Sequence, residues 1–420
     1  MLRQREASPG VTFFVLAAMI TSIVLLQRIA VPIGGGLPLV LATVLAGVVI
    51  LLLGGALVED KPRAAAYLLA ASLCVLAALG SLLLGSTGSL GSVLLLVVLY
   101  APFCYILAPD LRPLYPRLLD YFCRLMVVVG LLSIGQMVAQ LAGIWTYTDL
   151  FDHLPQQFVL SGYNTSYPVE FGSDIMKSNG VVLLEPSFCS QFLALAAIVE
   201  LERDGTKWWR IAIYLAGIIP TIAGTGLMLL AFGLIVITLR RSALWALGML
   251  LGTIAVTVIV AVTPAGKLFA ERASESREAG SSLSLRFIEP YQRAFDDLGA
   301  TEHGPFVGRG PGHVERVAEE YEERTDNSLA FPAVPKLISE YGLVAAVAFV
   351  WFTLLAFWSR APSATIAAAM LFFHLTLSGS LLQPPTVYIC LLISSIFAAA
   401  VPFRPIARAP LGAPAVPASR

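Results

Sequence analysis

The chain contains 420 residues, of which 57% are hydrophobic and 13% are charged, and its 27 Lys and Arg residues balance 27 Asp and Glu residues. So few charges could not cover the surface of a water-soluble enzyme, because soluble domains carry about 25% charged residues. The apolar content excludes a disordered chain, and the zero net charge excludes a protein held to nucleic acid by bulk basic charge. The composition therefore predicts a polytopic membrane protein.

Twelve apolar segments approach the roughly 20 residues that a membrane-spanning helix needs. They cover residues 10–29, 37–57, 64–85, 91–108, 120–143, 186–201, 209–223, 226–239, 243–263, 335–358, 362–378 and 385–402. The sixth begins at Pro186, and proline suits the first position of a helix. The run 209–239 forms either two short helices around residues 223–226 or one long tilted helix.

The positions of the basic residues favour two short helices in that run. With the N-terminus inside, more than half of the Lys and Arg residues fall in cytoplasmic segments, as the positive-inside rule requires. A single span over 209–239 would place Arg240, Arg241 and Arg360 outside. We therefore predict an all-α fold of about 12 transmembrane helices, with both termini in the cytoplasm.

This topology divides the chain into four parts. Residues 1–263 hold helices one to nine, interrupted by a long outer segment at 144–185. Residues 264–334 form a large outer loop, residues 335–402 hold the last three helices, and residues 403–420 form a cytoplasmic tail rich in Pro and Ala. A loop of about 70 residues is usually functional or has its own structure.

The large loop is predicted to contain two helices. Apolar residues of the first helix recur at helical spacing: Phe287, Tyr291, Phe295 and Leu298. The second covers 313–324 and turns Val314, Val317 and Tyr321 inward. The intervening segment 308–312 (GRGPG) is interpreted as a turn with an unusual backbone path, because no strand precedes it and no Walker lysine follows it.

Cysteine and histidine give no metal-site pattern. The five cysteines lie in or beside apolar segments without a CxxC pair, and the four histidines lack the spacing of a zinc site. No metal and no cofactor are expected. His374 lies inside the eleventh span, where a hydrogen bond between helices is its expected role.

Glu185 lies directly before Pro186, at the positive end of the sixth helix. A carboxylate there either complements the helix dipole or lies over a cavity at the membrane boundary as a functional group. It closes a run in which Lys177 is followed by Gly180, and then by Glu185, Pro186 and Ser187.

This run resembles the boundary motif of bacterial polysaccharide polymerases of the Wzy group and of O-antigen ligases. Four further matches lie in and after the large loop, in the same order: residues 284–287 (SLRF), 308–312 (GRGPG), 326–329 (DNSL) and 340–343 (EYGL). The layout of about twelve spans with one large late periplasmic loop is also similar to that family, and it is GT-C-like.

The resemblance implies a multi-pass glycosyltransferase of the hexosyltransferase type in the bacterial inner membrane, with its active site facing the periplasm. Its substrate would be a glycan on undecaprenyl pyrophosphate, polymerised into exopolysaccharide or O-antigen. A sugar hydroxyl attacks the anomeric carbon and the lipid pyrophosphate leaves. A chain-length regulator and a flippase are the implied protein partners, with membrane lipid around the spans.

The resemblance also assigns binding residues. Arg286 matches the family's loop arginine and is expected to contact the pyrophosphate, with Arg293 on the same helix as a second cation. Lys177 stands where the family usually has arginine, so it keeps the charge but loses the bidentate fork. Gly310 and Asn327 complete the expected binding set. The alternatives are a lipid head-group or salt-bridge contact for Arg286 and a solvated lysine for Lys177.

The base that accepts the acceptor's proton is left open. The ligases carry a histidine where this chain has Asp326, and an unperturbed aspartate titrates near pH 4. Glu185 is the competing base, and a purely electrostatic site, in which Arg286 carries the catalytic role, is the third option.

Two other functions are considered. An O-antigen ligase would transfer finished polymer to lipid A core, but Asp326 in place of histidine argues for a polymerase. A polysaccharide transporter or lipid-linked sugar flippase would place ionisable groups at mid-membrane, whereas this chain concentrates them in one outer loop and its rim.

Overall fold

The computed structural model describes residues 7–32, 36–160, 162–163, 165–170, 172–240, 248, 284–300, 302–325, 329–377 and 380–399. Within these ranges the protein is mostly helical and contains four short strands. The predicted tail at 403–420 and the first part of the large loop, 264–283, lie outside them.

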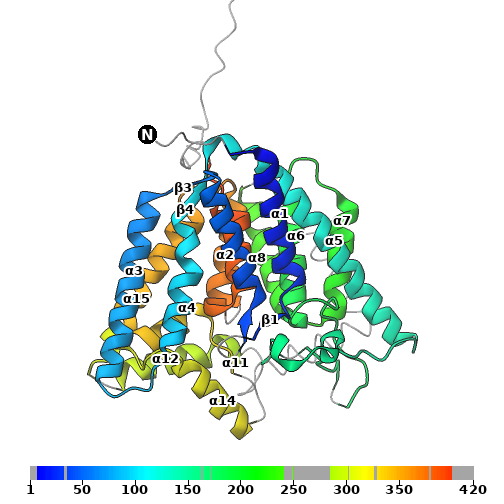
Figure 1. Ribbon diagram of the computed structural model, residues 1–420. Helices are drawn as coiled ribbons and strands as arrows, with labels where there is room; N and C mark the ends of the chain where they lie inside the picture. Colours follow the sequence, from blue (N-terminus) through cyan, green and yellow to red (C-terminus); the bar gives the residue numbers. More distant parts are fainter. Residues whose placement is uncertain are drawn as a thin grey trace, which may run out of the picture.

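The bundle consists of eleven helices within the described ranges, packed side by side (Figure 1). Their bounds are α1 (Pro9–Leu25), α2 (Leu39–Leu53), α3 (Lys61–Leu83), α4 (Leu90–Tyr100), α5 (Leu114–Leu141), α6 (Pro186–Glu202), α7 (Trp208–Ile218), α8 (Gly224–Arg240), α15 (Ala333–Trp358), α16 (Ala364–Phe372) and α17 (Pro384–Cys390). Single π-helical turns, Phe373–Leu377 and Leu391–Ser395, extend α16 and α17.

Four further helices cover one end of this bundle, which we call the loop end: α11 (Ser284–Phe287), α12 (Glu289–Gly299), α13 (Gly304–Val307) and α14 (His313–Thr325). α1 begins at the opposite end, which we call the N-terminal end (Figure 1). The predicted helix at 313–324 is confirmed by α14. The predicted first helix is divided at Ile288 into α11 and α12, so the expectation that Arg286 and Arg293 share one helix is wrong. Val314, Val317 and Tyr321 pack inward as expected, whereas Phe295 is exposed.

The strands tie connecting segments together. β1 (Ala30–Val31) pairs antiparallel with β2 (Leu37–Pro38), and β3 (Leu57–Glu59) pairs antiparallel with β4 (Tyr105–Leu107). The second pair joins the α2–α3 connection to the segment that follows α4. Both pairs are too short to form a core of their own.

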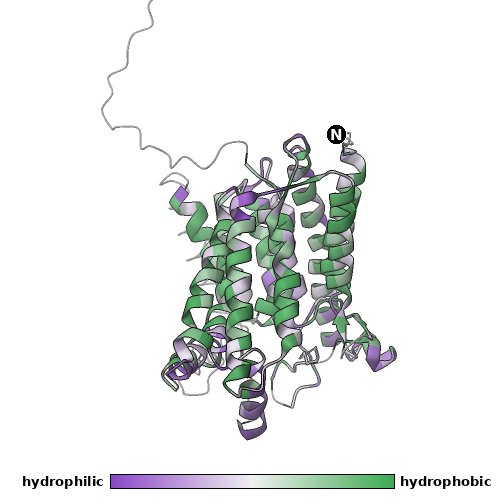
Figure 2. Ribbon diagram, turned by 60° about the vertical axis from the view of Figure 1, so that its left-hand side comes forward, coloured by the Kyte–Doolittle hydropathy of each residue, from purple (hydrophilic) through white to green (hydrophobic). Residues whose placement is uncertain are grey.

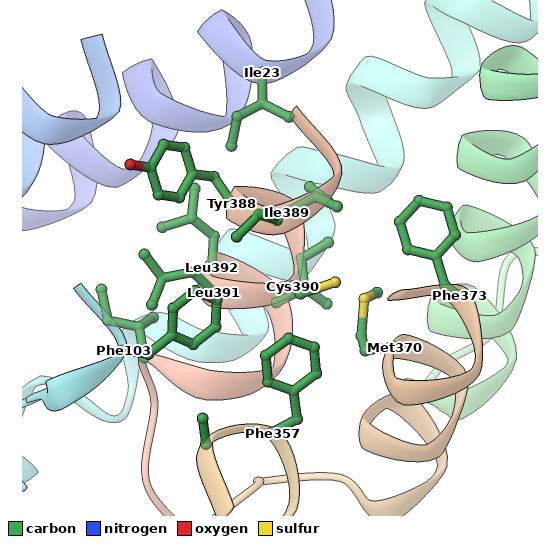
Figure 3. Packing of buried hydrophobic residues seen from close by; sticks show 14 of the residues in the cluster. Ile23, Phe103, Phe357, Met370, Phe373, Tyr388, Ile389, Cys390, Leu391 and Leu392 are labelled. Carbon is green, nitrogen blue, oxygen red and sulfur yellow. The ribbon is translucent and has the colours of Figure 1, made fainter. Parts of the chain in front are cut away.

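The core lies around α6 and α17. All residues of α17 are buried, and Figure 3 shows Tyr388, Ile389, Leu391 and Leu392 of this region among apolar side chains from other helices. α6 is buried on every face except at its ends. Helices that are apolar all round are expected to be enclosed in this way.

Helices occupy eleven of the twelve segments predicted to span a membrane, and the other, 243–263, lies outside the described residues apart from Gly248. Among the described helices, α3, α5 and α15 are long and apolar enough to cross a membrane, and six shorter ones are also apolar. Hydrophilic residues gather at the two ends (Figure 2). The protein is therefore a polytopic helical membrane protein, and the count of 12 spans with N-in, C-in orientation stays a prediction.

The run 209–239 is divided as the basic residues indicated. α7 ends at Ile218 and α8 begins at Gly224, with Ile222 in the left-handed region at φ 45° between them. On α8, a Cβ atom at Gly226 would lie 2.5 Å from the Ser190 backbone. The glycine therefore allows α8 to approach α6 closely.

Candidate active site

The segment 144–185 and helices α11–α14 lie at the loop end, so most residues predicted for the site share that end (Figure 1). Lys177 and Glu185 belong to the first segment, and Arg286, Arg293 and Gly310 to the second. Asp326 and Asn327 lie outside the described residues.

Two glutamines of α5 hold the segment that carries Lys177. The side-chain amide of Gln140 donates to the Met176 carbonyl at 3.0 Å, and the Met176 N–H donates to Gln140 Oε1 at 2.8 Å. Ser178 Oγ donates to Gln136 Oε1 at 2.8 Å. Because the glutamines are one turn apart on α5, they fix the backbone on both sides of Lys177.

Lys177 is buried rather than solvated. The ammonium nitrogen of Lys177 lies 3.9 Å from the centroid of the Tyr167 ring. The backbone N–H of Lys177 donates to the backbone carbonyl of Tyr167 at 2.8 Å. A cation over an aromatic face is stabilised by the ring quadrupole. The alternative of a solvated loop lysine is therefore wrong, and contact with pyrophosphate stays a prediction.

Glu185 is the N-cap residue of α6, and the helix begins at Pro186 as predicted. Ser187 Oγ donates to Glu185 Oε2 at 3.0 Å. Burial raises the pKa of Tyr163 to about 12, with the Glu185 charge adding to this and a hydrogen bond from Gln383 opposing it. Three distant parts of the chain therefore meet at this point, through Glu185, Tyr163 and Gln383.

Sequence reasoning did not identify Tyr163 or Gln383. Gln383 directly precedes the Pro384–Pro385 pair that opens α17, which marks a helix start but not a site residue. Tyr163 lies in a non-helical segment without any motif. Its ring packs edge-on against Phe188 of α6, with centroids 6.4 Å apart.

The end of α1 also holds this segment. Gln27 Oε1 accepts the N–H of Leu184, next to Glu185, at 3.3 Å. Arg28 forms a buried ion pair with Asp149 and lies over the Phe151 ring at 5.0 Å. Burial disfavours the charged form of Asp149, but the hydrogen bonds from Arg28 and from the Phe151 N–H, together with the charge of Arg28, outweigh it, so the pKa of Asp149 is lowered. The Glu185 region is therefore attached to the first helix.

Arg286 lies on α11, which is fastened by its neighbour Leu285. Leu285 packs with Val314 of α14 and with Leu329 and Phe331, and its carbonyl accepts the Ala330 N–H at 3.4 Å. Arg286 is half-buried, and its guanidinium forms no ion pair with any described residue. The SLRF motif therefore contacts the end of the DNSL motif and presents a cation without an acidic partner in the described part of the chain.

Arg293 lies on α12 with its guanidinium carbon 5.2 Å from the centroid of the Tyr321 ring on α14. This contact joins α12 to α14 without neutralising the charge of Arg293. A second cation for an anionic substrate stays a prediction for this residue.

The turn at 308–312 contacts the start of α15. Gly308, Gly310 and Gly312 all have positive φ, as the predicted unusual backbone path requires. The Arg309 N–H donates to the Ser339 carbonyl at 2.8 Å, and the Gly310 N–H to the Glu340 carbonyl at 3.1 Å. These two amides donate to α15, so the predicted turn with an unusual backbone path is confirmed and packs against the start of that helix.

The same contact explains the EYGL motif. α15 is broken at Gly342 (φ 78°, ψ 173°), and a Cβ atom there would lie 2.8 Å from the Phe306 backbone. A Cβ atom at Gly308 would lie 2.6 Å from the Glu340 backbone. Glu340 Oε1 also accepts the Gly312 N–H at 2.9 Å. The two motifs therefore form one backbone contact, and a binding role for Gly310 stays a prediction.

A polar cluster surrounds this contact. Asp297 accepts a hydrogen bond from Ser339, and its carboxylate lies 3.4 Å from His313 Nε2 and 3.6 Å from Arg309 Nε. Burial disfavours the charged form of Asp297, but the hydrogen bonds from His313 and Ser339, together with the charges of His313 and Arg309, outweigh it and lower the pKa of Asp297. The cluster fastens α12 and the turn to α15.

Two interior features agree with the sequence analysis. His374 Nε2 is hydrogen-bonded to the Tyr100 hydroxyl at 3.0 Å, which confirms a helix-to-helix contact. All five cysteines are buried. Among the described residues, no group of three or more His, Cys, Asp or Glu could hold a metal ion.

Comparison with known families adds the activity. The sequence model of the family described as WcaD colanic acid polymerase matches residues 15–399, which is nearly the whole chain. Comparisons with curated proteins and with solved structures gave no match. The match covers the helix bundle and both segments of the loop end, and it supports a polysaccharide polymerase of the glycosyltransferase type. The chain therefore belongs to the WcaD colanic acid polymerase family.

Proposed function

We propose that this polymerase joins oligosaccharide repeat units carried on undecaprenyl pyrophosphate, at the periplasmic face of the bacterial inner membrane. A hydroxyl of one repeat unit attacks the anomeric carbon of the next. The new glycosidic bond forms as the bond from that carbon to the pyrophosphate oxygen breaks. The lipid pyrophosphate leaves with the electron pair, and the hydroxyl proton passes to a base.

The observation that carries this proposal is the environment of the Arg286 guanidinium. Negative charge builds on the pyrophosphate as the bond breaks, so a cation near the membrane boundary would stabilise the transition state. The Arg286 guanidinium lies at the loop end, half-buried and without an ion pair among the described residues. An unpaired, partly desolvated guanidinium is suited to bind a pyrophosphate oxygen.

The carboxylate of Glu185 is our first choice for the base. It lies at the start of α6 beside Tyr163, whose hydroxyl is hydrogen-bonded by Gln383. This arrangement offers a proton acceptor with hydroxyl and amide groups that could orient a sugar. Asp326 is retained as the competing base, with Asn327 beside it as a sugar ligand. Lys177, Arg293 and Gly310 are proposed as further substrate contacts.

Substitution of Arg286 tests the proposal. We expect Arg286→Ala to abolish polymer in a strain that lacks the chromosomal gene, with normal protein levels in the membrane, and Arg286→Lys to retain part of the activity because it keeps the charge. The matched control is Arg324→Ala in the same loop, whose side chain is 77% exposed and pairs with Glu320. Polymer of wild-type length from the Arg286→Ala strain would remove Arg286 from the site.

The lipid-linked glycans of a deletion strain test the reaction class. Single repeat units accumulating on the periplasmic side indicate a lost polymerase and support the proposal. Long unattached lipid-linked chains would indicate a ligase, and repeat units retained on the cytoplasmic side would indicate a flippase. Crosslinking in the same strains would test the proposed chain-length regulator as a partner.

A further inference from the structure

An apolar groove of about 220 Å³ lies between α3, α13 and the broken part of α15. Leu76 and Ala77 of α3 form one wall, and Val344 of α15 forms the other. Phe306 and Val307 of α13 line the groove at the loop end. α3 and α15 pack side by side at one edge of the bundle (Figure 1).

The side chains around this groove are exposed although they are apolar. Phe306 is 65% exposed, Leu76 63% and Val344 45%. Leu76 and Val344 belong to two helices that are long and apolar enough to cross a membrane. Phe306 belongs to the large loop, yet it continues the same apolar surface.

α13 cannot easily move away from this position. A Cβ atom at Gly80 of α3 would lie 2.9 Å from Val307 Cγ1, so Val307 is inserted against the glycine. On the other side, the backbone of Phe306 lies against Gly342, at the break in α15. Two close contacts therefore fix how far Phe306 projects beside the two helices.

We propose that the groove holds an acyl chain of a bilayer lipid and that α13 lies within the lipid leaflet at the loop end. Exposed apolar residues continue from the groove along the outer sides of α3 and α15, including Leu69, Leu83, Val347 and Trp351. Lipid covers such a surface when these helices span a membrane. The charged Arg309 follows α13 after one glycine, so polar chain resumes directly beyond the proposed lipid contact.

This inference gives α13 a role distinct from substrate binding. The turn at 308–312 starts directly after α13. Lipid contact at Phe306 therefore sets the height of the turn, and of the polar cluster around Asp297, relative to the membrane surface. The large loop is anchored in the bilayer at a point outside the proposed active site.

Spin labelling of the full chain in phospholipid nanodiscs tests this placement. A nitroxide is attached at Phe306→Cys, with Leu76→Cys as the lipid-exposed reference and Glu320→Cys on α14 as the water-exposed reference. The five native cysteines are buried, and the parent protein treated in the same way measures their background. Power saturation then compares collisions with oxygen, which concentrates in lipid, and with a water-soluble nickel complex.

We expect the label at residue 306 to collide more with oxygen than with the nickel complex, as the label at residue 76 does. The label at residue 320 should collide more with the nickel complex. A preference for nickel at 306 would place α13 in water and overturn the inference. An immobilised label with few collisions with either reagent would show that protein, such as a second copy of the chain, covers the groove, which also overturns it. Phe306→Trp gives a second readout: lipids with brominated chains should quench its added fluorescence, and absence of quenching contradicts lipid contact.

Discussion

The two ends of the helix bundle use arginine differently. At the N-terminal end, Arg203 and Arg210 both pair with Asp120 and Glu200, at distances from 2.8 to 3.1 Å. At the loop end, Arg293 lies over an aromatic ring and Arg286 forms no ion pair with a described residue. Arg203 and Arg210 hold helices together at the first end. Arg28 and Arg309 do the same at the loop end, whereas the charges of Arg286 and Arg293 are not neutralised by a described acidic residue and are available for an anionic ligand.

The largest expected effect is at the N-terminal end. Arg210→Ala removes one of the two cations that neutralise Glu200, whose side chain is fully buried. Removing a partner from a buried charge costs about 3–5 kcal/mol. Because Arg203 still pairs with Glu200, we expect a loss of thermal stability near the lower end of that range, with a lower protein level in the membrane. Intrinsic tryptophan fluorescence in nanodiscs measures the unfolding.

Arg124 provides the matched control, because it pairs with the same Asp120 but its side chain is 68% exposed. Exposed ion pairs contribute about 0–1 kcal/mol, so Arg124→Ala should unfold close to the wild type. Equal effects of the two substitutions would contradict the view that buried pairing stabilises this end.

The second effect tests the backbone contact at the loop end. Gly308→Ala introduces a Cβ atom 2.6 Å from the Glu340 backbone at a residue with φ 62°. A strained backbone of this kind costs about 1–3 kcal/mol, so we expect faster proteolysis of the large loop together with a lower unfolding temperature. Gly299→Ala, which adds a Cβ atom with no neighbour within 4 Å, should leave both unchanged. Wild-type protease resistance of Gly308→Ala would show that the turn can separate from α15.

Much of the helical architecture could be predicted from the sequence. Apolar segments indicate where helices lie, Pro186 marks the start of α6, and the placement of Arg240 indicates the break between α7 and α8. These signals act within a few residues along the chain, so one sequence contains them.

The site was predicted less completely, because its geometry depends on contacts between distant segments. Glu185 was identified as a candidate, but its proximity to Tyr163 and Gln383 results from the packing of α6 against two other parts of the chain. The GRGPG and EYGL motifs were both recognised, yet nothing in either motif shows that they bind each other. Gly308 and Gly342 are required by this mutual approach, which only the fold reveals.

A smaller effect concerns Asp297, the acidic residue that fastens α12 at the loop end. Its pKa is lowered in the folded protein, so its ionised form contributes stability above the unfolded pKa of about 3.9, and this contribution is lost as the pH falls through the folded pKa. The difference in unfolding temperature between wild type and Asp297→Asn should therefore be constant above about pH 5 and shrink below about pH 4. The same substitution at the exposed neighbouring residue, Asp296→Asn, should show no such pH-dependent difference in unfolding temperature from the wild type. If the difference between wild type and Asp297→Asn persisted at low pH, the ionised carboxylate of Asp297 would not be the stabilising group.

The smallest effect on stability is expected from Arg286→Ala, the substitution with the largest expected effect on activity. Because Arg286 has no ion pair among the described residues to lose, the change should alter the free energy of unfolding by less than about 1 kcal/mol. The adjacent Leu285→Ala, which empties a buried position between α11 and α14, should cost about 2–5 kcal/mol. Thermal unfolding of both variants in the same nanodiscs measures the contrast. If Arg286→Ala destabilised the protein as much as Leu285→Ala, loss of polymer would reflect a disordered loop, and Arg286 would resemble the structural arginines of the N-terminal end.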